Sequence, residues 1–469
     1  MRPTPRWKAG LAAALFPALA SASGFLIEHV NVLPMTREGT AVADATVVVR
    51  DGTIVDLGPS GKVHAPRGLP RIDGHGKWLM PGLADMHVHL MNWGLIKLQT
   101  GQAQFPEEFL HTEDVTLPFI ANGVTQIQDM GSLPELLQQR REIDSGTVLG
   151  PHYSLAGMVD GANPVWPGVA RVAASPDAGR SAVREVKEQG FDFVKIYSRL
   201  DLETYHAILD EGQAEGIRVI GHLPDAGRGH PEAVLVPGLA MVAHAEEYTK
   251  YSPNFSDQDI ERLVAPAREN HIWLTPTLIT MYWIANQTRD GVAVVAENPN
   301  LKYTHPALVA QWLHANRYVQ SATPARARLF QKTEAFNNRL VHAFAAAGIP
   351  MLTGTDAIVP GVVYGFSLHD ELEMLARAGM TNAQVLQSAT RGAAEFLGVA
   401  DKRGTVEVGR AADLVLLYGN PLIDISNTRR IAAVVMGGRY LSRAELDRRM
   451  SDLAKRFAAI KVPGQLGGT

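Results

Sequence analysis

The sequence predicts an α/β protein: a (β/α)8 TIM barrel joined to a small discontinuous β-sandwich domain. Two observations predict this architecture. Short apolar runs alternate with amphipathic helical patterns through the middle of the 469-residue chain, as in repeated βα units around a parallel sheet. Two β-rich stretches flank that region, and neither has enough strands to bury both faces of a sheet alone. We therefore expect the two stretches to pair with each other.

The first 22 residues have the pattern of a cleaved signal peptide. Three basic residues precede an apolar run over 9–20, and the Ala-Ser-Ala sequence at 20–22 is a cleavage site. The run is shorter than the ~20 residues that span a bilayer, and Pro17 interrupts it, so we expect no stable membrane anchor. We predict a secreted or periplasmic protein. Cleavage would change its formal net charge from -4 to about -7, which does not favour nucleic acid as a partner.

Turn residues and periodicity divide the rest of the chain into three parts. Residues 23–80 and 400–445 are predicted to form the small β domain, in which Asp51 and Gly52 make a hairpin turn. Residues 81–399 are predicted to form the barrel. Residues 446–469 are predicted to be a C-terminal helical tail.

Eight short apolar runs are the expected strands of the barrel. In chain order they are LADMHVH, VTQIQDM, VLGPHYSLAG, FDFVKIY, IRVIGHL, AMVAHAE, IWLTPTL and IPMLTGTD. Each is bounded by helix-like segments, such as LETYHAILDEGQAEG after the fourth. Enzymes with this fold carry their chemistry at the C-terminal ends of the strands.

Ionisable residues stand at the ends of five of these strands, where they would converge on one mouth: His87, His89, Lys195, His222, His244 and Asp356. One such residue alone would most often be a hydrogen-bonded interior group. Five strands burying uncompensated polar groups at the same end would cost several kcal/mol per charge, and a shared cation removes that cost. Since the chain has no cysteine, its metal ligands must be histidine, carboxylate or modified lysine.

Lys195 indicates how many ions are held. An ammonium group cannot bind a metal, so this lysine must lose its proton. Reaction of the neutral amine with carbon dioxide gives a carbamate, an anion that can bridge two ions. We therefore expect two divalent metal ions and N6-carboxylated Lys195. Zinc fits this ligand set best, although Mn, Fe, Co and Ni also accept these ligand types.

The motifs PGLADMHVHL, VKIY, GHLP, AHAEE and GTDA resemble the amidohydrolase superfamily. The resemblance is to its binuclear subgroup with a carboxylated lysine, which includes prolidase-like and ochratoxinase-like amidohydrolases. It implies that one metal is held by His87, His89 and Asp356 and the other by His222 and His244, with Lys195 bridging. It also implies a metal-bridging hydroxide as nucleophile and Asp356 as the catalytic proton shuttle.

Two further residues are predicted to bind substrate. Tyr197 follows Lys195 by two positions, so it shares a face of the strand and is placed to hydrogen-bond a substrate carbonyl or carboxylate. An ordinary packing role for Tyr197 fits the pattern equally well. His152 and Tyr153 follow the third strand, and one of them is expected to stabilise the tetrahedral intermediate; we predict that it is His152.

The connection between the seventh and eighth strands, from 273 to 350, is far longer than a usual βα loop with its helix. Its aromatic residues are Tyr282, Trp283, Tyr303 and Trp312, accompanied by His305. They indicate either a lid or pocket wall at the site, or an interface in a homo-oligomer.

The predicted activity is hydrolysis of the amide or peptide C–N bond of a small-molecule substrate, either a dipeptide or an N-acyl amino acid. Cyclic amide (imidazolone-like) hydrolysis is an alternative on the same site, as is ester, lactone or phosphoester hydrolysis. The sequence favours a non-catalytic binding barrel least, because all six ligand residues are present.

Overall fold

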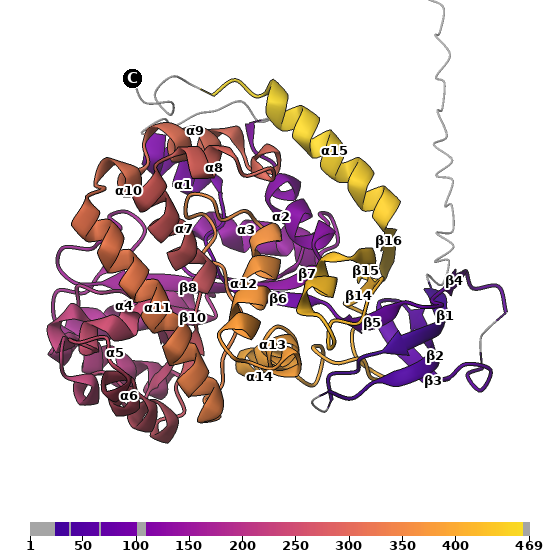
Figure 1. Cartoon of the computed structure of the whole chain (residues 1–469), viewed down its shortest axis with the longest axis horizontal. Coiled ribbons are helices and arrows are strands. Elements are labelled where there is room, and N and C mark those ends of the chain that lie inside the picture. Colours follow the sequence, from indigo (N-terminus) through magenta and orange to yellow (C-terminus); the bar gives the residue numbers. More distant parts are fainter. Residues whose placement is uncertain (1–23, 37–38, 65–66, 101–108, 463–469) are drawn as a thin grey trace, which may run out of the picture.

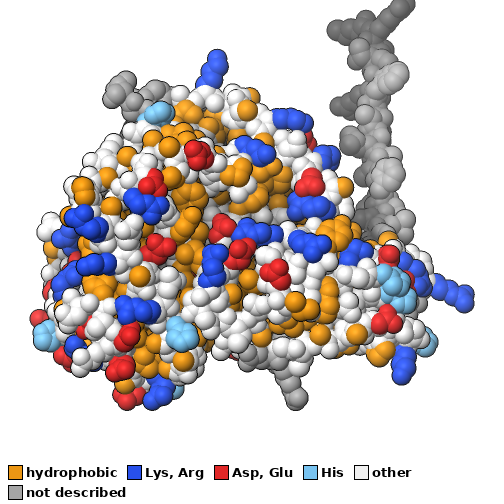
Figure 2. Space-filling view, in the orientation of Figure 1, with side chains coloured by type: hydrophobic (Ala, Val, Ile, Leu, Met, Phe, Trp, Pro, Cys, Tyr) orange, Lys and Arg blue, Asp and Glu red, His pale blue; other side chains and the backbone are white. Residues whose placement is uncertain are grey.

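The computed structural model describes residues 24–36, 39–64, 67–100 and 109–462. The predicted signal peptide at 1–22 and the end of the predicted tail lie outside the described residues. Within the described ranges, no helix has both the length and the apolar character needed to cross a membrane. Figure 1 shows a helix-covered barrel with the N-terminal strands on one flank. On the face shown in Figure 2, basic and acidic side chains are interspersed rather than gathered by sign.

The N-terminal and C-terminal segments form one eight-stranded sheet, which confirms the expected discontinuous β domain. Its strands are β1 (Gly24–Val32), β2 (Val42–Arg50), β3 (Thr53–Pro59), β4 (Arg71–Asp73), β5 (Trp78–Pro81), β14 (Leu414–Leu417), β15 (Ile431–Met436) and β16 (Arg439–Ser442). They are hydrogen-bonded in the order β16-β15-β14-β5-β1-β2-β3, with β4 beside β1. Residues from both ends of this order, such as Ile54 and Ala433, share one apolar core, so the sheet folds over like a sandwich.

The hairpin between β2 and β3 turns at Asp51 and Gly52, as predicted. Arg50 pairs with Thr53 across the turn, and the two central residues have φ of 48° and 75°. Positive φ at both positions is the geometry of a tight turn that matches the twist of the strands.

The second sheet is parallel and forms the barrel. Its strands are β6 (Leu83–Val88), β7 (Val124–Asp129), β8 (His152–Asp160), β10 (Phe193–Ile196), β11 (Arg218–Gly221), β12 (Leu239–Ala243) and β13 (Trp273–Thr275), with the short β9 (Arg171–Val172) beside β8. The predicted eighth strand is present only as an isolated bridge between Met351 and Leu274. Backbone hydrogen bonds nevertheless close the ring. For example, Leu352 N donates to Leu274 O at 2.9 Å on one side, and Met86 N donates to Thr353 O at 2.8 Å on the other.

Helices cover the outside of the barrel (Figure 1). They are α1 (Trp93–Thr100), α2 (Thr112–Ala121), α3 (Pro134–Asp144), α4 (Pro176–Glu188), α5 (Leu202–Glu215), α6 (Asp257–Glu269), α12 (Phe366–Arg377), α13 (Asn382–Ser388) and α14 (Arg391–Leu397). The 3-10 helices are η2 (Asp225–Gly227), η3 (Pro231–Ala233), η4 (Ala245–Tyr251), η5 (Leu301–Tyr303) and η6 (Ile425–Arg429). Local sequence explains α5, for example: Asp201 accepts the Thr204 backbone N–H at its start, and left-handed Gly216 ends it.

The long connection after β13 forms an insertion of five helices. They are α7 (Leu278–Asp290), α8 (Ala293–Ala296), α9 (Pro306–His314), α10 (Arg317–Gln320) and α11 (Pro324–Ala346). The last helix, α15 (Arg443–Ala459), runs along the barrel beside α2 (Figure 1). Its buried face consists of Leu446, Met450, Leu453 and Phe457, so this helix is packed onto the barrel and is not a free tail.

Phe396 of α14 packs against the interior of the barrel. Its ring stacks on that of Phe193 with centroids 5.7 Å apart and meets the edge of Trp273 at 5.3 Å. The cluster also contains Met86 and Leu352 from the first strand and the closing segment. This contact joins residues from distant parts of the barrel.

Replacing Phe396 by alanine should therefore lower the free energy of unfolding by about 3–5 kcal/mol, because the cavity left between Phe193 and Trp273 cannot collapse fully. Urea unfolding followed by circular dichroism measures this loss. Leu329→Ala is the matched control: its side chain is 48% exposed on α11, and we expect a loss below about 1 kcal/mol. Equal losses in the two variants would contradict the packing role of Phe396.

Candidate metal centre

His87, His89 and Asp356 form a cluster of metal-binding side chains. His87 lies on β6 and His89 follows it by two residues, so both rings project to the same side. Their Nε2 atoms lie 3.3 and 3.2 Å from Oδ1 of Asp356. One ligand atom from each residue lies within 4.8 Å of the others. Among the described residues, no other group of three such side chains meets that spacing.

Asp356 reaches the two histidines because the closing segment is hydrogen-bonded to β6. Its backbone N–H donates to His87 O at 2.7 Å, and its φ is 54°. Next to it, the Thr355 hydroxyl donates to the buried carboxylate of Asp85 at 2.7 Å. A left-handed backbone is unfavourable for an aspartate and persists only where its surroundings hold it. The fold therefore holds Asp356 against a local preference, as is common at functional sites.

His222 and His244 extend the cluster from the ends of β11 and β12. Their ring centroids are 4.8 Å apart, and the ring of His244 lies 4.3 Å from that of His87. His222 Nδ1 lies 3.0 Å from Oε1 of Glu247, and His244 Nδ1 lies 2.7 Å from the hydroxyl of Thr277. Such bonds orient each ring and leave its other nitrogen for a metal.

This set of donors fits divalent metal ions. Burial lowers the pKa of His87 well below its usual value, that of His222 to about 4 and that of His244 to about 3, so these rings are neutral at physiological pH. Nε2 of His222 is buried without a hydrogen-bond partner among the described residues. An unpaired buried nitrogen is unfavourable, and a bound metal would satisfy it. Neutral imidazole and carboxylate are ligands that zinc and related ions accept.

Lys195 of β10 lies beside these side chains and is 1% exposed. Its side chain makes no hydrogen bond or ion pair with another described residue, and its Nζ lies 5.3 Å from the ring centroid of Tyr197. Burial lowers the pKa of Lys195 to about 8, although the negative charges of Asp356, Asp129 and Glu247 oppose that shift. Its amine is therefore closer to the neutral, reactive form than an exposed lysine is.

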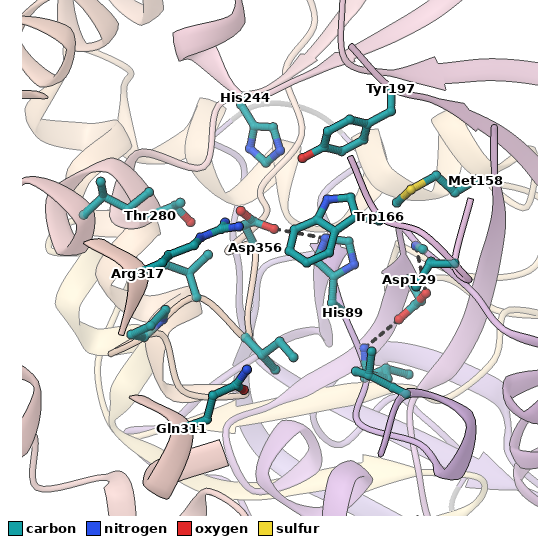
Figure 3. A pocket seen from close by; sticks show the side chains of 18 of the residues that line it. His89, Asp129, Met158, Trp166, Tyr197, His244, Thr280, Gln311, Arg317 and Asp356 are labelled. Carbon is teal, nitrogen blue, oxygen red and sulfur yellow. Dashed lines mark hydrogen bonds and ion pairs between the residues drawn. The ribbon is translucent and has the colours of Figure 1, made fainter. Parts of the chain in front are cut away.

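Most of these residues line a cavity of about 390 Å³ at the C-terminal ends of the strands. Tyr197 also lines it, with its ring 4.0 Å from that of His222. Burial raises the pKa of Tyr197 well above its usual value, so the phenol keeps its proton. Figure 3 shows its hydroxyl pointing into the cavity, near His244 and Asp356. The structure thus brings together all six predicted ligand residues and Tyr197.

The prediction for His152 is wrong. His152 is the first residue of β8, where it pairs with Gln126, so it lies at the opposite end of the barrel from the cavity. Its Nε2 lies 3.0 Å from Oδ2 of Asp413, which immediately precedes β14. The third strand extends to Asp160, several residues beyond the expected end, and this shift places His152 at the wrong end for catalysis.

The insertion after β13 forms part of the cavity wall. Of its predicted aromatic residues, Trp312 lines the cavity. Tyr282 and Trp283 line a separate groove between α7, α11 and α12. Tyr303 stacks on Phe366, and His305 lies 2.7 Å from the carbonyl oxygen of Phe109, so both have packing roles.

Sequence reasoning missed other residues of the site, notably Trp166 and Arg317 in the cavity and Thr277 and Glu247 behind the histidines. Trp166 follows β8, and a correct end for that strand would have pointed to its loop. Arg317 begins α10, a helix of four residues, which is too short to give a periodic signal in the sequence. Glu247 stands three residues after His244 in the AHAEE motif, where its acidic character was the available signal.

This chain is similar to known proteins both in sequence and in fold. The amidohydrolase family matches residues 78–441. Imidazolonepropionase of Stenotrophomonas maltophilia is 23% identical over 426 residues, covering 83% of this chain and 90% of that protein. A solved Xaa-Pro dipeptidase with bound methionine has a TM-score of 0.65 at 20% identity, covering 90% of this chain and 100% of its own. Ochratoxinase of A. niger has a TM-score of 0.63 at 17% identity, covering 90% and 96%.

Thr277→Val should weaken metal binding by about 10- to 100-fold, because it removes the hydroxyl that orients His244 and leaves the side-chain shape almost unchanged. Metal affinity is measured by titration of the metal-depleted protein. Thr428→Val is a matched control, since it removes the same kind of contact, 3.0 Å from Nδ1 of His369, away from the cavity. Equal metal affinity in the wild type and Thr277→Val would contradict this role for the hydroxyl.

Proposed function

Because this chain belongs to the amidohydrolase family and is a hydrolase of C–N bonds, we propose that it cleaves the amide or peptide bond of a dipeptide or an N-acyl amino acid. The observation that carries this proposal is Lys195, whose buried side chain makes no hydrogen bond or ion pair among the described residues and lines the same cavity as His89, His222, His244 and Asp356. A permanently charged lysine beside metal ions would be repelled. We propose that Lys195 is N6-carboxylated, which makes it an anionic ligand.

The modification balances without a further reagent. The neutral amine of Lys195 adds to carbon dioxide and releases one proton, so the product is a carbamate anion. Such an anion can bridge two ions, one at His87, His89 and Asp356 and the other at His222 and His244. This arrangement is the binuclear centre that we propose, with zinc as the favoured metal.

The bound ions would supply an activated hydroxide and a Lewis acid for the scissile carbonyl. The other contributions come from side chains. Asp356 has its carboxylate among the histidines and within the cavity, so it can accept a proton and deliver it to the leaving nitrogen. The protonated hydroxyl of Tyr197 points into the cavity, where it can donate a hydrogen bond to the substrate.

Cyclic amide hydrolysis is the second candidate, and the imidazolonepropionase relatives favour it. The resemblance spans most of both chains, but its level of 23% identity leaves room for a different substrate. Lys195 favours the peptide-type substrate, because the resemblance to the subgroup with a carboxylated lysine implies two bridged ions. Comparing the turnover of imidazolonepropionate with that of dipeptides and N-acyl amino acids separates the two candidates.

We also propose that the protein acts outside the cytoplasm. The support is the charge and hydropathy pattern of residues 1–22, which lie outside the described residues. Protein recovered from the periplasm or medium, with an intact mass that matches a chain beginning at Ser23, would support export.

Lys195→Ala should lose bound metal and reduce kcat/KM together, by at least about 1000-fold, since the lysine acts with the centre as a unit. Short carboxylic acids such as acetate or propionate should restore part of the activity by replacing the missing anion. Lys187→Ala is the control, because this exposed lysine on α4 only pairs with Glu215. Full metal content and normal turnover in Lys195→Ala would rule out the bridging role.

The mature protein purified without chelators should contain about two metal ions per chain, measured by inductively coupled plasma mass spectrometry. Native mass spectrometry should show an addition of ~44 Da, the mass of one carbon dioxide on Lys195. Finding one metal or none, without the addition, would contradict the binuclear centre and favour the ring-opening alternative.

A further inference from the structure

We infer that Arg317 binds a free carboxylate on the substrate, so that the enzyme selects compounds whose scissile bond lies next to a carboxyl terminus. The inference rests on the proposed function and makes it more specific. It assigns a recognition role to a residue of the insertion rather than to the strands. Dipeptides and N-acyl amino acids both carry such a carboxylate, whereas their C-terminal amides do not.

The position of Arg317 is the first support. It lines the same cavity as Asp356, and Figure 3 shows its guanidinium group directed toward that carboxylate from the wall of the cavity. The backbone that carries it is fixed by buried Asn316, whose Oδ1 accepts the backbone N–H of Tyr318 at 3.1 Å. The Asn316 amide also donates to Oε1 of Gln287 on α7 at 2.6 Å. The guanidinium therefore extends from an anchored turn.

The contacts of the guanidinium are the second support. It lies over the rings of Trp166 and Tyr318, 5.2 and 4.9 Å from their centroids, and Nη2 donates to the Tyr318 hydroxyl at 2.9 Å. It makes no ion pair with any described carboxylate, whereas Arg184 and Arg429 each pair with a glutamate. Aromatic faces hold the planar group in one orientation and leave N–H donors for a ligand. A carboxylate is the anion that such a fork binds with two parallel hydrogen bonds.

The charges around the cavity are the third support. Apart from Lys195 within the metal centre, Arg317 is the one lysine or arginine among the described residues that line it. Figure 3 shows Met158 on the other side of Asp356 from Arg317. Apolar residues Leu90, Leu95, Leu133 and Val169 line the cavity together with Met158. The cavity thus has one cationic position for a carboxylate and an apolar surface suited to an acyl group or side chain.

The test uses a matched pair of compounds, N-acetyl-L-phenylalanine and its C-terminal primary amide. Wild-type enzyme should prefer the acid. Arg317→Met should lower kcat/KM for the acid by about 10- to 100-fold, mainly through a higher KM, because charge-assisted hydrogen bonds are lost. Turnover of the amide should change by less than about threefold. The kcat/KM of Arg317→Lys for the acid should lie between those of the wild type and Arg317→Met, since lysine keeps the positive charge and lacks the two parallel N–H donors of the guanidinium.

Two further variants separate recognition from general structural effects. Arg326→Met removes an arginine from α11 of the same insertion, outside the cavity, and should leave kcat/KM unchanged for both compounds. Tyr318→Phe keeps the ring and removes the hydroxyl that positions Arg317. The kcat/KM for the acid should therefore fall less in this variant than in Arg317→Met. Equal losses for acid and amide in Arg317→Met, or a wild type that does not distinguish the two compounds, would overturn the inference.

A failure of the proposed function gives a different result. If the wild type hydrolyses neither compound, calorimetric binding of the same pair tests Arg317 by itself. Tighter binding of the acid that disappears in Arg317→Met would support the inference while the proposed substrate is rejected. Equal binding of acid and amide to the wild type would overturn it.

Discussion

The candidate site depends on the hydrogen bonds that tie the closing segment of the barrel to β6. The carbonyl oxygen of His87 accepts the backbone N–H of Asp356, while Asp85 accepts both the backbone N–H and the hydroxyl of Thr355. These bonds hold Asp356 at φ 54° and bring its carboxylate to the two imidazoles of β6. Barrel closure and assembly of the cluster are therefore one structural event, and the strained aspartate is stabilised by the fold rather than by its own backbone preference.

The side chains of the site come from two kinds of backbone, strand ends and the connections between strands, which differ in how well they tolerate sequence changes. The residues that fit a metal come from strand ends, where backbone hydrogen bonds to the neighbouring strands hold the chain in place. Hydrogen bonds to buried partners such as Glu247 and Thr277 orient the histidine rings. Other residues of the cavity lie outside the strands, with Trp166 after β8 and Arg317 at the start of α10 in the insertion. Loops tolerate insertion and substitution far better than strands. The chemistry and the choice of substrate can therefore change independently.

Sequence patterns predicted the barrel, the paired terminal segments and the residues now found around the cavity, because alternating apolar runs report burial directly. They placed the third strand wrongly, since a long apolar run does not indicate where its ladder begins, and this error put His152 at the catalytic end. The predicted eighth strand is reduced to a bridge at Met351, because the following residues bend into the site. Arg317 and Trp166 escaped prediction because contacts between distant loops leave no periodic signal in either segment.

The similar proteins share the fold of this chain and differ in the substrates that their names give. An imidazolonepropionase, a Xaa-Pro dipeptidase and an ochratoxinase all resemble this chain over most of its length, although their names describe different substrates. A shared fold is compatible with different substrates, because the fold alone does not determine which molecule is bound. Residues that choose between substrates can therefore lie outside the strands. Arg317, at the start of α10, contacts Trp166 of the segment after β8 and leaves a cationic donor facing the carboxylate of Asp356. Electrostatic complementarity at that position, rather than the metal-binding cluster, is what can exclude uncharged amides.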